Sequence, residues 1–177
     1  MKDELTEREA ANFVVNSIFT DVEKAWPEID RTLRSLPVYR DKFIIDDERA
    51  TILDLFLAMF AFEFGALKNL VPVEQAARLF SFGLECIDPD SLDYARQEIA
   101  LYEKAADAAL KASENPAFAI PARLVVRWLA ERTKSFEVEI LGDKFIDPLL
   151  IMGVTDLLFR LIGLGRWKDI REHFVLV

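Results

Sequence analysis

Cysteine and histidine each occur once in this chain of 177 residues, and each scarcity excludes a class of site. A lone Cys86 cannot close an intramolecular disulfide, which agrees with a reducing compartment. Its apolar neighbours Phe82, Leu84 and Ile87 predict a buried thiol. Because His173 is the only histidine, the chain has no Ser-His-Asp triad, no zinc signature and no Glu-x-x-His pair of a di-iron bundle.

Glycine is also scarce, with six residues, and none of them builds a phosphate-binding loop. The sequence Gly163-Leu164-Gly165 lacks the third glycine and the preceding strand that a dinucleotide-binding loop needs. Long apolar runs are missing too. Residues 55–62 and 148–155 are each flanked by acids and fall short of the ~20 residues that span a bilayer. The sequence therefore predicts core helices and no membrane partner.

Basic residues are outnumbered, with 22 Lys and Arg against 31 Asp and Glu, which gives a formal charge of −9. This balance argues against sequence-independent binding of phosphate backbones and predicts that nucleic acid is not a partner. An acidic surface instead favours a basic partner. The first residues, Met1 to Glu4, are charged and do not resemble a secretory signal, so we expect a cytoplasmic protein.

What the chain does contain is apolar residues, 52% of the total, with 14 Phe among them. This composition suffices for one hydrophobic core, and we expect a single helical domain over residues 1–177. Apolar residues recur mainly at three- and four-residue spacing, which predicts an all-α bundle of seven or eight helices. The exception is 136–140, where alternation with period two predicts at most a short strand pair.

Several helix boundaries are marked by the sequence. Thr6 followed by Glu9 forms a capping box at the start of the first helix, and Pro27 is expected to end or kink that helix. A separate short helix is predicted over 28–36. The long apolar segment 48–70 is the expected central helix, and 148–163 is a second buried helix.

The tetrapeptide Asp-Lys-Phe-Ile occurs at 41–44 and again at 143–146. The same offset superimposes Trp26 on Trp128, and apolar positions of 26–62 match those of 128–164. Two interpretations remain open: an internal pseudo-duplication of the bundle, or a coincidental likeness between two helix entrances.

Glu63 is the most unusual single residue, because it lies among phenylalanines within the predicted central helix. Neither Met59 nor Leu67, one turn away on either side, can pair with its carboxylate. Arg123 and Arg127 are candidate bases for a structural ion pair and the candidate ligand-binding residues. Without such a partner, Glu63 would be a desolvated acid with a raised pKa, as at many functional sites.

Carboxylates without histidine can still hold Mg²⁺, so Asp41 and Asp143 join Glu63 as candidate catalytic acids. They would serve a metal-dependent hydrolase only if they converge in space. The one Glu-x-x-Glu pair, Glu4 and Glu7, lies at the start of the chain and is a poor metal motif. The sequence predicts no resident metal and no cofactor.

The absence of a catalytic constellation favours a non-catalytic protein-interaction module over an enzyme. Its expected surface is the acidic stretch 85–107, which carries seven Asp and Glu residues against two basic ones. Self-association is the other partner hypothesis, with the apolar tail 174–177 buried in a homodimer. The alternative function is the carboxylate-based hydrolase, or a protein that binds a small ligand.

Overall fold

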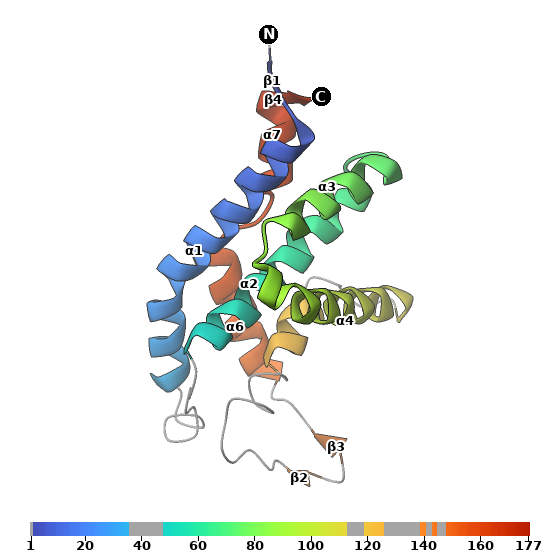
Figure 1. The fold of residues 1–177 in the computed structure, drawn as a ribbon. Helices are drawn as coiled ribbons and strands as arrows, with labels where there is room; N and C mark the ends of the chain where they lie inside the picture. Colours follow the sequence, from blue (N-terminus) through green and yellow to red (C-terminus); the bar gives the residue numbers. More distant parts are fainter. Residues whose placement is uncertain (1, 36–47, 113–118, 126–138, 141–142, 145–147) are drawn as a thin grey trace.

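A computed structural model of the protein describes residues 2–35, 48–112, 119–125, 139–140, 143–144 and 148–177. Figure 1 shows an almost entirely helical fold, which confirms the all-α prediction. Six α-helices have bounds within these residues, slightly fewer than the seven or eight expected. They are α1 (Glu7–Ser35), α2 (Glu48–Ala66), α3 (Val73–Glu85), α4 (Leu92–Lys111), α6 (Pro148–Leu161) and α7 (Arg166–His173).

The first helix begins as predicted. The backbone N–H of Thr6 donates to Oε2 of Glu9 at 3.0 Å, and the N–H of Glu9 donates to Oγ1 of Thr6 at 3.2 Å. These reciprocal bonds make up the capping box and occupy two donors that the helix itself leaves free.

Pro27 does not divide the helix, so the prediction of a separate helix over 28–36 is wrong. The buried stripe of α1 continues through the proline, with Trp26, Ile29 and Leu33 each at most 3% exposed. Burial of these large side chains offsets the missing backbone bond at the proline. The Trp26 indole also donates to Oε1 of Glu48 at 2.8 Å, which ties α1 to the start of α2.

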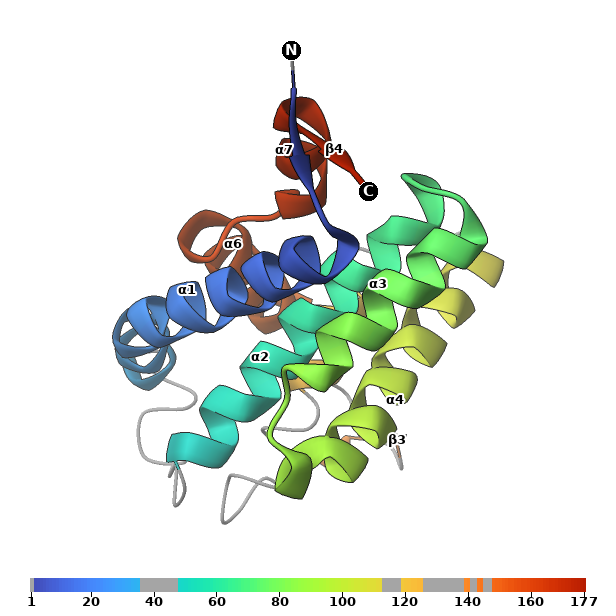
Figure 2. The same ribbon diagram turned by 45° about the horizontal axis from the view of Figure 1, so that its top comes forward.

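Helix α2 is the central element, as expected. It packs against α1 and α4, while α1 also packs against α3 (Figure 2). Apolar residues are buried on nearly every side of it. The 3₁₀ turn η1 (Leu67–Asn69) extends it, and a second turn, η2 (Pro89–Ser91), leads into α4.

Together α2 and η1 are long and apolar enough to cross a bilayer by length and composition alone. The apolar run 55–62, taken by itself, underestimates the length of this segment. In the most apolar 18-residue stretch of this segment, 67% is buried within the structure, which is the arrangement of a core helix.

The core is built around stacked aromatic rings on α2. The rings of Phe60 and Phe64 stack with centroids 4.1 Å apart, and Trp167 of α7 meets Phe64 edge-on at 5.2 Å. Phe80 of α3 meets Phe60 edge-on at 5.7 Å. Offset and edge-to-face ring pairs of this kind stabilise beyond their buried area, by ~0.5–1.5 kcal/mol each.

Among the described residues, two small sheets accompany the helices. Strand β1 (Asp3–Leu5) pairs in parallel with β4 (Phe174–Leu176), so the two ends of the chain lie together (Figure 1). The apolar tail 174–177, for which burial in a homodimer is one hypothesis, therefore pairs with the N-terminal strand of its own chain, and the homodimer stays a prediction. Val175 and Val177 remain 47% and 57% exposed.

The second sheet, β2 (Glu139–Ile140) with β3 (Asp143–Lys144), is antiparallel. It contains the end of the strand expected over 136–140. The rest of that strand, and most of the segments on which the internal duplication depends, lie outside the described residues. The duplication stays a prediction.

Cys86 is exposed, so the predicted buried thiol is wrong. Helix α3 ends one residue earlier, at Glu85, and Cys86 occupies the cap position rather than the inner face. Its sulfhydryl contacts Oδ1 of Asn12 at 2.8 Å. Desolvation of the sulfur raises the pKa of the Cys86 thiol, and the nearby Glu85 carboxylate raises it further. A raised pKa disfavours the reactive thiolate.

Candidate functional site

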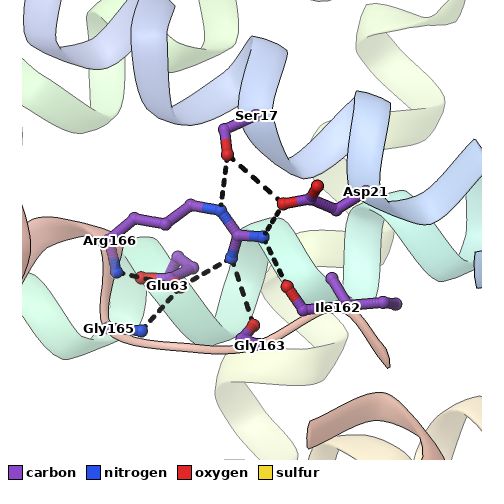
Figure 3. Close-up of polar contacts among 7 residues, drawn as sticks. All are labelled: Ser17, Asp21, Glu63, Ile162, Gly163, Gly165 and Arg166. Carbon is purple, nitrogen blue, oxygen red and sulfur yellow. Dashed lines mark hydrogen bonds and ion pairs between the residues drawn. The ribbon is translucent and has the colours of Figure 1, made fainter. Parts of the chain in front are cut away.

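Two regions are candidates for a functional site, and the first surrounds Glu63. This side chain is 2% exposed, deep in α2. Its Oε1 accepts from Nη1 of Arg166 at 2.9 Å, from the backbone N–H of Gly165 at 2.9 Å and from that of Arg166 at 3.4 Å. Figure 3 shows the carboxylate beside Gly165 and Arg166 at the start of α7.

The turn between α6 and α7 makes this contact feasible. Gly163 and Gly165 have φ angles of 71° and 97°, in the left-handed region that a side chain disfavours. The turn directs the N-terminus of α7 at Glu63. A helix N-terminus carries unpaired N–H donors, so it suits a carboxylate.

Every N–H donor of the Arg166 side chain has an acceptor. Nε donates to Oγ of Ser17 at 3.0 Å, and Nη2 donates to Oδ2 of Asp21 at 2.6 Å. The carbonyl oxygens of Ile162 and Gly163 accept at 2.8 Å and 3.2 Å. With the Glu63 contact, five acceptors face the five N–H bonds of a guanidinium (Figure 3).

This arrangement is a structural clamp, here called the Arg166 clamp: Arg166 with Ser17, Asp21, Glu63, Ile162 and Gly163. It joins α1, α2 and the end of α6 through one buried cation. The ion pair expected for Glu63 is present, but its base is Arg166 instead of Arg123. A carboxylate that is buried and bound by a guanidinium is not open to a substrate.

The other predicted residues do not assemble around Glu63. Arg123 lies in the helical stretch 119–125, where Nη2 is 3.7 Å from Oε2 of Glu98 and the guanidinium faces the Tyr102 ring at 5.7 Å. Arg127 and Asp41 lie outside the described residues. Asp143 is in β3, and its side chain is not described. Within the described ranges, no three His, Cys, Asp or Glu side chains are placed to share a metal ion.

The acidic residues of the stretch 85–107 do not all face solvent. The acidic surface expected from the sequence is therefore smaller than the stretch itself. Glu85 pairs with Arg8, Glu98 is 7% exposed beside Arg123, and Asp88 caps η2 through the N–H of Asp90. The exposed acids that remain are Asp90, Asp93 and Asp107.

The second region is a pocket where the end of α2 and η1 lie beside α4. Its volume is about 320 Å³, at the lower end of the range for small-molecule sites. The lining is mainly apolar, and the residues are Ala61, Phe62, Gly65, Ala66, Lys68, Asn69, Glu103, Ala106, Asp107, Leu110 and Ile120. Small residues on α2 leave the space: a Cβ atom built on Gly65 would meet nothing within 4 Å.

The pocket has an apolar floor, and its exposed mouth holds polar groups beside the apolar Leu110, which is 60% exposed. Ala61 and Ile120 are buried, whereas Lys68, Asn69 and Asp107 are exposed. Nζ of Lys68 lies 3.6 Å from Oε1 of Glu103 across the mouth. An apolar cavity with a few polar groups at its edge is the usual form of a ligand site.

This pocket was not predicted from the sequence. The available pattern was the small residues Ala61, Gly65 and Ala66 on α2, with Glu103 and Asp107 one turn apart on α4. Neither pattern shows that the two helices meet there.

Comparison with protein families, with curated proteins and with solved structures finds no match to this chain.

Proposed function

We propose that the protein binds a small, largely apolar molecule in the pocket between α2, η1 and α4, without catalysing a reaction. The observation that carries this proposal is the pocket itself, with its apolar floor and a mouth that holds Lys68, Asn69, Glu103 and Asp107. Burying an apolar ligand there would stabilise the complex by about 25 cal/mol for each Å² removed from water.

Support for a binding role without catalysis comes from Glu63. It was the strongest candidate acid in the sequence, and the Arg166 clamp occupies it. The pocket's own carboxylates lie at its exposed mouth, where no described base or nucleophile is desolvated beside them.

Gly65→Leu tests the site. The neutral fluorescent probe N-phenyl-1-naphthylamine should bind the wild-type protein with increased emission. A leucine side chain at 65 has open space to occupy, so it should fill part of the pocket and weaken the probe's affinity by about tenfold or more, a loss of ~1.4 kcal/mol. Fluorescence titration measures both affinities.

Gly153→Leu is the matched control. Gly153 is also a helical glycine with nothing within 4 Å of a built Cβ, but it is exposed on α6 and does not line the pocket. Its variant should bind the probe like the wild type. Equal probe affinity in both variants would place the site elsewhere, and no probe binding by the wild type would overturn the proposal.

A second proposal retains the protein-interaction module expected from the sequence, now confined to Asp90 and Asp93 near the start of α4. Both are exposed, and neither forms an ion pair within the described part of the chain. They stand near the helix N-terminus, which does not neutralise two full charges. A basic partner would gain from this surface.

Charge reversal tests that surface. Asp90→Lys with Asp93→Lys should weaken binding of a deca-lysine peptide severalfold at low salt, with a smaller difference at high salt because exposed charges are screened. Asp3→Lys with Glu4→Lys makes the same change in net charge on exposed residues of β1 and is the control. Equal weakening by both pairs would indicate net charge alone and contradict a docking surface on α4.

A further inference from the structure

The charges at the pocket mouth are unequal. One base, Lys68, faces two acids, Glu103 and Asp107. All three belong to the described lining, and the protein as a whole carries a formal charge of −9. The field at the mouth therefore disfavours an anion and favours a cation.

The two acids differ in availability. Glu103 forms an exposed ion pair with Lys68. Nζ of Lys68 lies 3.6 Å from Oε1 of Glu103, and the side chains of Lys68 and Glu103 are 61% and 33% exposed. The side chain of Asp107, one turn further along α4, forms no hydrogen bond or ion pair with any residue of the described chain. Lys111, a further turn away, does not pair with it either. The Asp107 carboxylate is thus free to accept from a ligand.

On the face of α4 that lines the pocket, Asp107 lies beside apolar residues. Glu103, Ala106, Asp107 and Leu110 follow the three- and four-residue spacing of one helix face. Across from them lie Phe62 and the small residues of α2. A ligand that reaches Asp107 with one end can therefore bury the other end against carbon.

We infer that the ligand is an amphipathic organic cation, with a protonated amine held at the mouth by Asp107 and Glu103 and an apolar chain or ring in the pocket. This rests on the proposed function, because it requires that the pocket bind a ligand at all. Lys68 has an indirect role in this site. Its ammonium pairs with Glu103 and leaves Asp107 as the main acceptor.

The test compares three ligands of one chain length, hexylamine, hexan-1-ol and hexanoate, in displacing N-phenyl-1-naphthylamine from the full-length protein at pH 7. Hexylamine should displace the probe at a concentration about fivefold lower than hexan-1-ol, the upper size for an ion pair at an exposed site. Hexanoate should be the weakest of the three. The preference for the amine should shrink in 1 M NaCl, where exposed charges are screened.

Asp107→Asn keeps the shape of the side chain and removes its charge. It should abolish most of the amine preference, so that hexylamine and hexan-1-ol displace the probe at similar concentrations. Asp93→Asn removes an exposed charge from the same helix outside the pocket, and it should keep the preference.

The outcomes separate the two proposals. If the probe binds and hexan-1-ol displaces it as well as hexylamine does, or hexanoate does so better, the cation inference is wrong and the pocket remains a ligand site. The cation inference is equally wrong if Asp93→Asn removes the preference as fully as Asp107→Asn. If neither the probe nor any of the three ligands binds, the proposed function fails together with the inference.

Discussion

Arg166→Met should destabilise the protein by about 3–5 kcal/mol, because it leaves the carboxylate of Glu63 buried without its cation. The side chain of Arg166 is 10% exposed and that of Glu63 is 2% exposed, so water cannot readily replace the lost partner. The variant also leaves the carbonyl oxygens of Ile162 and Gly163 without these donors at the end of α6. Urea unfolding followed by circular dichroism measures the change.

The control lies on the same helix. Lys168 pairs with Glu172 at 3.8 Å, four residues on, with side chains 74% and 57% exposed. Lys168→Met should cost at most about 0.5 kcal/mol, as for an exposed helical pair. If Arg166→Met costs no more than this control, the Arg166 clamp contributes nothing to stability.

A double-mutant cycle separates the pair from its surroundings. Glu63→Leu removes the buried charge that Arg166→Met leaves behind, so the double variant should be more stable than the sum of the two single effects predicts. The coupling should exceed the ~0.5 kcal/mol within which independent sites add. Strict additivity would mean that the 2.9 Å contact between Nη1 and Oε1 carries no specific energy.

The sequence sufficed for the features that depend on neighbours along the chain. The capping box of Thr6 and Glu9 needs only three residues and one helical turn, and it forms as predicted. The central position of α2 followed from apolar residues on all its sides, which a surface helix cannot have. The abnormal environment of Glu63 was also readable, since no base lies one turn away from it.

The partner of Glu63 could not be read in the same way. Arg166 lies 103 residues away, and it reaches the carboxylate only because the turn after α6 places α7 beside α2. The candidate bases Arg123 and Arg127 stand four residues apart, a local property that says nothing about which surface they face. Long-range packing decided between the bases.

The ends of helices show the same difference between local sequence signals and long-range packing. Pro27 removes one backbone bond, which a local rule counts against the helix. The rule does not count the burial of Ile29 and Leu33 against the rest of the fold, and that burial keeps α1 continuous through residue 35. The pocket was missed for a related reason, since it exists only where two helices meet.

Gly83→Ala should destabilise the protein by about 1–3 kcal/mol, although alanine is the better helix former. A Cβ atom at this position in α3 would lie 2.6 Å from Cζ and 2.7 Å from Cε1 of Phe64, far inside van der Waals contact. The Phe64 ring cannot withdraw freely. It stacks on Phe60 with centroids 4.1 Å apart and meets Trp167 edge-on at 5.2 Å and Phe80 at 6.2 Å.

Gly153→Ala isolates the cost of this clash, since it makes the same substitution in α6 where nothing lies within 4 Å of the new methyl group. There the helix propensity of alanine acts alone, and the variant should gain up to about 1 kcal/mol. Urea unfolding of both variants should therefore give changes of opposite sign. If Gly83→Ala also stabilises the protein, the rings on α2 can move aside at little cost, and the aromatic core is less tightly packed than the 4.1 Å stack of Phe60 on Phe64 indicates.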